Sequence, residues 1–325
     1  MAKIKSVIGF EVDTAEIRAV ELTKANGAYS VLACGKIPLP ADTIEEGFIR
    51  NADEFNKCLT ELLQNGNFKS SDVVVGVNNE NVIMRYASFP KVPEDKLRNM
   101  VLLQAQEFIP IPVQEMEIDY VIAGESIGDE DQPLVNVLLV AARRNMLEQL
   151  ITVLGASKLQ VIDIDSSVLS VCRGLAPITA DKKYALLNLT DDILNFMVVK
   201  NTEISMVRSI TIPERATSAV RSVFSQAQET VPQEDLEAVG NMLASETNSS
   251  VSYYTMQNME EPIEQIYFVS AARDAESLAK MVSDSIYTIP VDIPILYTEQ
   301  NLGLSQDVVK EFAGCIGLAM QALEG

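Results

Sequence analysis

The chain has 325 residues, 47% of them hydrophobic, and a formal net charge of −21. This length is typical of two domains, and the charge argues against nucleic-acid binding, which requires clustered Lys and Arg. The sequence contains no histidine, which excludes Ser-His-Asp and Cys-His catalysis, histidine-ligated metals and a histidine pH switch. An enzyme of this composition would have to use carboxylates, Lys, Arg or a bound nucleotide.

The cysteines are far apart and form no CxxC pair, so we expect four separate thiols rather than disulfides or a zinc site: Cys34, Cys58, Cys172 and Cys315. Apolar runs such as "PLVNVLLVAA" fall well short of the ~20 residues that span a bilayer. The N-terminus lacks the apolar region and cleavage site of a signal peptide. We therefore predict a cytoplasmic chain with no direct membrane insertion.

The N-terminal segment predicts three strands, "SVIGFEVD", "IRAVELTK" and "YSVLACGKIPLP". An acidic turn separates the first two, and the hairpin signal Asn26-Gly27 separates the last two. A helix over residues 53–64 follows, because apolar residues recur there at helical spacing. The run "SDVVVGV" then predicts a buried strand.

A different pattern begins near Phe89. Pro93 is typical of a helix start, and "IPIP" from Ile109 ends that helix. The strands "MEIDYVIAG" and "LVNVLLVAA" and a helix to Gly155 follow. This order favours a small α+β module, at about residues 89–156, inserted in the first domain.

A second meander begins near Tyr184, where "YALLNLTDDILNFMVVKNTEISMVRSITIP" again predicts strand, acidic turn, strand, turn and strand. Its Leu187 aligns with Phe10 of the first, which indicates two related halves, residues 1–182 and 183–325. The remaining predicted elements are helices over 215–229, 233–257 and 274–284, a core strand "IEQIYFVSAA", a short strand "IPVDIPIL", and an amphipathic helix over 305–322 that could pack back on the first domain.

Several stretches resemble the type IV pilus assembly protein PilM family of actin-like ATPases. They are "FPKVPEDKLRNMVLLQAQEFIPIPVQEMEIDYVI", "VNVLLVAARRNMLEQLITVLGASKLQVIDIDSSVLSV", "SVSYY" and "AGCIGLAMQAL". The resemblance implies an α/β, actin-like (ribonuclease H-like) duplicated two-domain fold with a nucleotide cleft. By resemblance, the cleft positions are Gly9, Glu11, Asp13, Thr14, Asn188, Thr190, Asp191, Ser270, Ala271 and Ala272.

The family's nucleotide-binding motifs are degenerate in this sequence. Gly9 and Thr14 match the first hairpin, but its aspartate is replaced by Glu11 and its turn glycine by Asp13. In the second hairpin Asn188 replaces the aspartate and Thr190 the glycine. Ser270, Ala271 and Ala272 replace the glycines of the adenosine loop.

Glycine in such turns lets backbone N–H groups approach a phosphate closely. A carboxylate at Asp13 would instead repel a phosphate ~4 Å away by about 4 kcal/mol at an effective dielectric near 20. Three interpretations follow: a solvated acidic turn without a ligand, weak nucleotide binding, and a cation site of Glu11, Asp13, Asp191 and Asp192. We predict the first, a pseudo-ATPase with no catalytic residue and no cofactor; ATP with Mg²⁺ is the alternative.

The resemblance also implies a partner. PilM-like proteins bind the N-terminal cytoplasmic tail of PilN, an inner-membrane protein, in a groove between the first domain and the inserted module. We therefore expect a scaffold recruited to the inner face of the membrane, in contact with other pilus inner-membrane components. The expected groove residues are Arg85, Tyr86, Phe89 and Pro90. The alternatives are an active actin-like ATPase, a sugar- or acid-kinase relative, and a filament-forming division-type relative.

Overall fold

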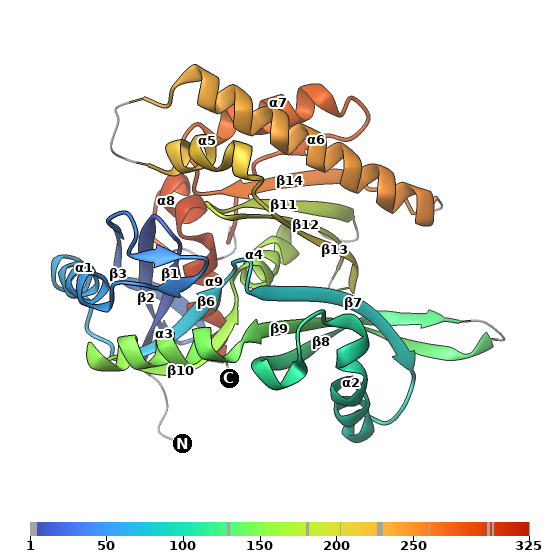
Figure 1. Cartoon of the computed structure of the whole chain (residues 1–325), viewed down its shortest axis with the longest axis horizontal. Helices are drawn as coiled ribbons and strands as arrows, with labels where there is room; N and C mark the ends of the chain where they lie inside the picture. The colour runs from blue at the N-terminus through green and yellow to red at the C-terminus, as the bar shows by residue number, and fades with distance from the viewer. Residues whose placement is uncertain are drawn as a thin grey trace.

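The computed structural model describes residues 5–128, 131–179, 182–201, 203–225, 230–259, 261–297, 300 and 302–324. It contains two five-stranded sheets and a three-stranded sheet that lies to one side of them (Figure 1). Within these residues, we find no helix with the length and hydropathy needed to cross a membrane.

The first sheet has the strand order β10-β6-β1-β2-β3. Its antiparallel meander consists of β1 (Ser6–Val12), β2 (Glu16–Ala25) and β3 (Ala28–Pro38). The strands β6 (Asp72–Val77) and β10 (Gln160–Ser166) extend it in parallel beyond β1. Because helices cover both of its faces, β1 and β2 are buried on both sides rather than in alternation.

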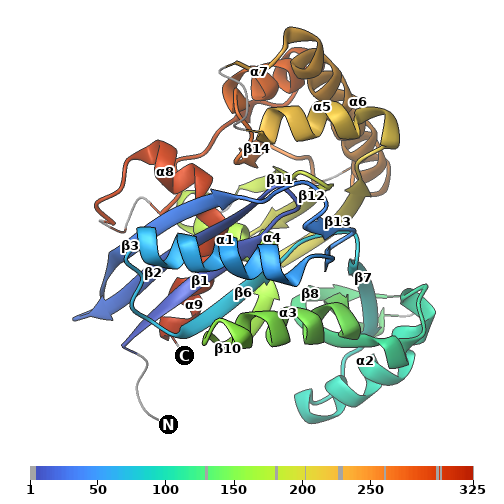
Figure 2. The ribbon, with the colours of Figure 1, turned by 60° about the vertical axis from the view of Figure 1, so that its left-hand side comes forward.

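One face of this sheet packs against α1 (Ala52–Asn65) and α3 (Arg144–Ala156). The opposite face packs against α4 (Ser167–Leu175) and α9 (Ala313–Glu324), as Figure 2 shows. The shorter elements are the strands β4 (Ile44–Glu45) and β5 (Phe48–Ile49) and the 3-10 helices η1 (Val113–Glu115) and η3 (Ala176–Ile178).

The second sheet repeats the topology of the first, in the order β13-β12-β11-β14-β15. Its strands are β11 (Lys183–Leu189), β12 (Ile193–Lys200), β13 (Glu203–Thr211), β14 (Gln265–Ser270) and β15 (Val291–Asp292). Its outer face packs against α5 (Glu214–Phe224), α6 (Gln233–Gln257) and α7 (Ala275–Ser285). Helix α5 ends before the expected residue 229, and residues 226–229 lie outside the described part.

The module is an antiparallel sheet of order β7-β9-β8 with α2 (Glu94–Phe108) on one face. Its strands are β7 (Val82–Pro90), β8 (Met116–Ile127) and β9 (Pro133–Arg143). Two details differ from the expected module at 89–156. Strand β7 begins at Val82, and α3 packs in the core of the first sheet because its apolar side faces β10 and α1.

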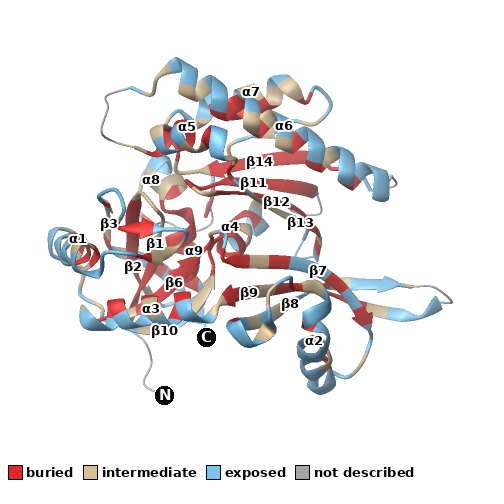
Figure 3. Cartoon of the chain, viewed as in Figure 1, coloured by how far each residue is buried: buried red, intermediate tan, exposed pale blue. Residues whose placement is uncertain are grey.

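The prediction of one amphipathic helix over residues 305–322 is wrong in two respects. The segment forms α8 (Gln306–Glu311) and α9, with a break at Phe312. Helix α9 is buried from Ala313 to Met320, so it has no exposed face along this length (Figure 3). The reason is its position, because it contacts β1, β2, β6 and α4.

Close backbone contact holds α9 against β1. A Cβ atom at Gly9 would lie 1.8 Å from the carbonyl oxygen of Cys315. On the helix side, a Cβ atom at Gly314 would lie 2.2 Å from a carboxylate oxygen of Glu11. Glycine is therefore required at position 9 by space rather than by backbone conformation, and a larger residue at position 314 would displace the Glu11 side chain.

We expect Gly9→Ala to push α9 away from β1 and to lower the free energy of unfolding by about 1–3 kcal/mol, because overpacking displaces buried backbone. Gly155→Ala in α3 is the control, since a Cβ atom there meets nothing within 4 Å. Urea unfolding of both variants measures the difference. Equal stability of the Gly9 variant and the wild type would contradict this packing.

Candidate functional site

The turn between β1 and β2 closes through a backbone hydrogen bond from Asp13 N to Glu16 O, at 3.0 Å. Asp13 is not among the residues with positive φ, so this turn does not need the left-handed conformation that favours glycine. The loss of the family's glycine therefore leaves the hairpin intact.

The side chain of Asp13 contacts Arg18, a residue of β2 that sequence analysis did not single out. The Arg18 guanidinium donates to carboxylate oxygens of Asp13 and Glu16. Its Nε lies 3.8 Å from Oε2 of Glu11. We call these four side chains the Arg18 cluster; Glu11, Glu16 and Arg18 are buried, and the side chain of Asp13 is 12% exposed. The expectation of a solvated acidic turn is therefore wrong, because the acidic groups are enclosed and paired with a cation.

Burial raises the pKa of Asp13 well above its usual value, and the attraction of Arg18 offsets this only in part. The carboxylates of Asp191, Glu11 and Asp192 raise it further. For Arg18, burial opposes the charge, but Asp13, Glu11 and Glu16 outweigh burial and raise its pKa, so the guanidinium stays charged.

The second hairpin reaches across to the first. Oδ2 of Asp191 accepts a hydrogen bond from the backbone N–H of Ala15 at 2.8 Å. Burial raises the pKa of Asp191, although the N–H groups of Ala15 and Thr14 stabilise its charged form. Asp191 is thus a contact between the two halves rather than a free acid in a solvated turn.

Buried asparagines make a second contact between the halves. Nδ2 of Asn195 donates to Oδ1 of Asn78 at 2.8 Å, and Nδ2 of Asn78 donates to Oδ1 of Asn188 at 3.4 Å. Asn188 in turn donates to the carbonyl oxygen of Val269 at 3.0 Å, and Ser209 donates to Oδ1 of Asn195 at 2.8 Å. The amide that replaces the family's aspartate therefore has a hydrogen-bonded structural role.

The structure brings many of the expected cleft residues to one small cavity of about 30 Å³, which has room for one or two water molecules. Its lining includes Arg18, Lys310 and six of the expected positions: Glu11, Asp13, Asn188, Thr190, Ser270 and Ala271. Gly9 and Ala272 do not line it, because Gly9 packs on α9 and Ala272 lies in the core of the second sheet.

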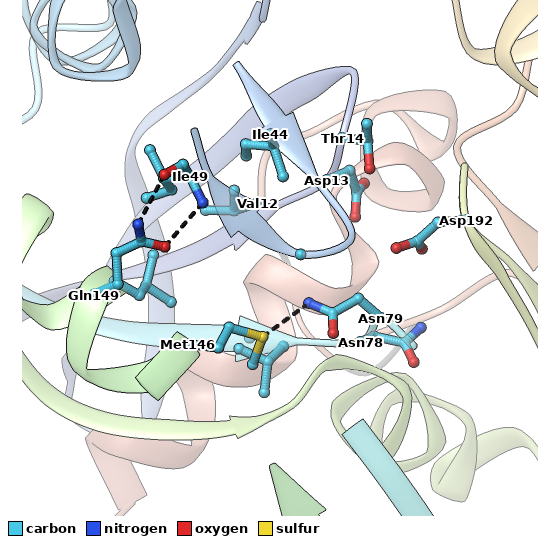
Figure 4. A pocket seen from close by; sticks show the side chains of 14 residues that line it. Val12, Asp13, Thr14, Ile44, Ile49, Asn78, Asn79, Met146, Gln149 and Asp192 are labelled. Carbon is cyan, nitrogen blue, oxygen red and sulfur yellow. Dashed lines mark hydrogen bonds between the residues drawn. The ribbon is translucent and has the colours of Figure 1, made fainter. Parts of the chain in front are cut away.

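A neighbouring cavity of about 20 Å³ lies where the two turns face each other (Figure 4). Asp13 and Thr14 approach it from the first turn and Asp192 from the second. Burial, together with the charge of Asp191, raises the pKa of Asp192 to about 8. Asp192 also accepts a hydrogen bond from the Thr190 hydroxyl at 3.1 Å.

Two acids of the suggested cation site, Glu11 and Asp13, face Arg18. In the part of the chain that the structure describes, no group of three or more His, Cys, Asp or Glu residues is arranged to hold a metal ion. The guanidinium already provides positive charge between the carboxylates that a hard cation would need.

Of the four expected groove residues, Arg85, Tyr86 and Pro90 are exposed and Phe89 is buried. Phe89 is 0% exposed and packs against Phe108 in the core of the module, so it cannot contact a partner. Arg85 donates to the carbonyl oxygen of Met84, and Tyr86 lies near Glu203 of β13. Pro90 is exposed at the far end of β7.

A large cavity, which we call the module cavity, lies between the module and the first sheet and has a volume of about 300 Å³. Among the described residues that line it, none of the four expected groove residues appears. Its lining comes from β6, α2, β8, β9, α3, β10 and α4: Val77, Arg98, Glu117, Ile118, Asp119, Tyr120, Val121, Val140, Ala142, Leu147, Ile164, Asp165, Ser166 and Leu169. Sequence analysis missed these residues because strands far apart in the chain build the cavity.

Asp192 provides a test of the buried acidic turn. The pKa of Asp192 in the folded chain is about 8, above its ordinary value of 3.8. The contribution of protonated Asp192 to the free energy of unfolding is therefore fully present below pH 4 and is lost as the pH rises through 8. We expect Asp192→Asn to be more stable than the wild type by roughly 1–3 kcal/mol at pH 8.5, with little difference near pH 4. Urea unfolding at both pH values measures this. The exposed Asp95→Asn is the control, and a gain for Asp192→Asn that does not depend on pH would contradict the assignment.

The structure is similar to two solved structures. That of the PilM-PilN type IV pilus biogenesis complex matches with a TM-score of 0.78 and 18% identity, covering 99% of this chain and 100% of that one. That of the ethanolamine utilization protein EutJ from Carboxydothermus hydrogenoformans matches with a TM-score of 0.55 and 11% identity, covering 100% of this chain and 91% of that one. These likenesses confirm the expected actin-like α/β fold.

The sequence itself matches the family model of type IV pilus assembly protein PilM from residue 9 to residue 322. The match includes the module, the second hairpin and most of the first hairpin and of α9. The chain therefore belongs to the family of type IV pilus assembly protein PilM.

Proposed function

We propose that this chain is a cytoplasmic scaffold of the type IV pilus machine that binds the cytoplasmic tail of a PilN-like inner-membrane protein and has lost ATPase activity. The loss of ATPase activity depends on one observation above all: Arg18 is buried among Glu11, Asp13 and Glu16 in the nucleotide cleft. The proposal of a PilN-like partner rests on family membership and on the module cavity.

The Arg18 cluster opposes the binding of a nucleotide. A triphosphate next to it would meet the carboxylates of Glu11 and Asp13, which are already paired with the guanidinium. To recruit Arg18, the phosphates would have to leave those carboxylates buried without a partner. Breaking a buried ion pair in this way costs about 3–5 kcal/mol.

The closed cleft adds a second cost. Cavities that hold small-molecule ligands usually have volumes of roughly 300–1,000 Å³, whereas the two cavities here have about 20 and 30 Å³. A nucleotide would therefore have to separate the halves and break the Ala15–Asp191 and Asn78–Asn195 hydrogen bonds.

The module cavity has the properties of a peptide site. It combines apolar side chains, among them Val140, Leu147 and Leu169, with the carboxylates of Glu117 and Asp119. Cytoplasmic flanks of membrane helices carry an excess of Lys and Arg. The solved complex that this structure resembles contains PilM with PilN, which supports a tail of this kind as the ligand.

We expect no measurable binding of Mg-ATP at millimolar concentrations, because both the charges and the closed cleft oppose it. Isothermal calorimetry and thermal unfolding check this. The variant Asp13→Gly with Thr190→Gly, which removes one carboxylate and restores two turn glycines, should gain some affinity. Micromolar binding by the wild-type chain would overturn the pseudo-ATPase proposal and favour the active ATPase.

We expect a synthetic PilN-like tail peptide to bind with an on-rate that falls steeply with salt and an off-rate that barely changes, because a chain of net charge −21 steers basic peptides. Val121→Arg in the module cavity should weaken binding by at least about tenfold, since it places a like charge beside the basic peptide. Leu103→Arg on α2, 83% exposed and outside the cavity, is the matched control. Surface-binding kinetics measure both, and no binding by the wild type would rule out the scaffold proposal.

A further inference from the structure

The two turns that face each other in the cleft bring acidic residues of both halves together. Asp13 lies in the turn between β1 and β2, and Asp191 and Asp192 lie in the turn between β11 and β12. The backbone N–H of Ala15 donates across the cleft to Oδ2 of Asp191 at 2.8 Å. Asp13 and Asp192 line the same cavity of about 20 Å³, where their carboxylates face each other (Figure 4). Three carboxylates therefore meet where the two halves touch.

Negative charge exceeds positive charge at this contact. The Arg18 cluster contains three carboxylates and one guanidinium. Lys36 adds a second cation, since its Nζ lies 3.8 Å from Oε2 of Glu16, but it also pairs with a carboxylate of α8. Among the ion pairs of the described residues, none includes Asp191 or Asp192. With these two acids, five carboxylates share two cations.

The other elements packed against the contact do not balance this excess. Glu80, between β6 and β7, acts on Asp192 as a further negative charge. Lys310 of α8 lines the neighbouring cavity, but it pairs with carboxylates of α7 and of its own helix. Helix α9 contributes the thiol of Cys315, which donates to Oε2 of Glu11 at 3.3 Å. The side chains that β6 and β11 bring to the contact are the neutral amides described above.

One carboxylate oxygen shows the same imbalance. Asp191 is 3% exposed, and its Oδ1 is buried without a hydrogen-bond partner among the described residues. A buried carboxylate without a partner is costly, and protonation removes its charge. Burial raises the pKa of Asp13, Asp191 and Asp192 above the ordinary 3.8. The closed contact therefore holds protons that the same acids would release once the turns separate into water.

We propose that a proton-dependent contact joins the two halves of this chain: closure of the cleft takes up protons on the facing turns, and loss of these protons separates the halves. Because the closed state binds more protons than the open state, low pH favours closure and opening becomes easier as the pH rises. Asp192 holds one of these protons. The proposal concerns the chain alone and does not depend on the binding of a tail.

The test is hydrogen exchange of the full-length chain, followed by NMR between pH 5 and pH 7, with each rate divided by the intrinsic rate at that pH. The N–H of Ala15 reports separation of the halves, because its acceptor lies in the other half. The side-chain amide of Asn195, which donates to Asn78, is a second reporter of the same event. The N–H of Leu187, in the central strand β11, reports global unfolding.

We expect the opening equilibrium constant at Ala15 to rise by at least about tenfold per pH unit, which is the linkage of one released proton. Asn195 should follow the same slope, and Leu187 should exchange more slowly than both. Asp192→Asn removes one titrating acid, so the slope should fall by about a factor of ten per pH unit. Asp95→Asn, at an exposed position of α2, is the control and should leave the slope unchanged.

Four results would overturn the proposal. An opening constant at Ala15 that stays the same from pH 5 to pH 7 would show that no proton is linked to closure. Equal exchange of Ala15 and Leu187 would show that the halves separate only on global unfolding. A pH dependence at Ala15 without one at Asn195 would indicate fraying of a single turn. An unchanged slope in Asp192→Asn would place the titrating acid outside the facing turns.

Discussion

The architecture of the cleft depends on the burial of one charge. A guanidinium inside a protein must be paired, because desolvation of an isolated ion is very costly. Arg18 finds its partners within its own hairpin, in Glu11, Asp13 and Glu16. The hairpin register places Glu11 directly opposite Arg18, so β-pairing itself forms part of the cluster. Because these carboxylates balance the charge of Arg18 within one hairpin, that charge does not require a ligand to compensate it.

Neutral and charge-assisted hydrogen bonds between the two halves then keep the cleft closed. Asp191 caps a backbone N–H of the first turn, and Asn78, Asn188 and Asn195 form a buried amide chain between the sheets. A buried amide that loses its partner costs free energy, so each of these contacts opposes opening. The module lies outside this arrangement. Its outer strand borders a larger cavity, which lies apart from the closed cleft.

Family and fold could be predicted from local sequence, while the details of both sites could not. The first hairpin, the second meander and the strands β8 and β9 of the module appear where the sequence predicted them, whereas β7 was not predicted. The domain boundaries stay a prediction. Phe89 was expected in a groove because it ends a strand, but α2 folds over it and buries it. Arg18 was overlooked, although pairing the hairpin "GFEVDTAEIRAVE" by register would have set it opposite Glu11.

The sequence by itself determined the absence of histidine chemistry, the net charge of −21, the repeated meander and the loss of turn glycines, because these depend on residue type and short-range order. Only the tertiary structure decided what the substituted residues do. Asp13 pairs with Arg18 once β1 and β2 form their hairpin, and Asn188 bridges to Asn78, which lies 110 residues away in the chain. The same holds for α9, whose burial comes from the sheet and helix on either side of it. Burial and partners are properties of the assembled layers, and local sequence does not specify which layers will meet.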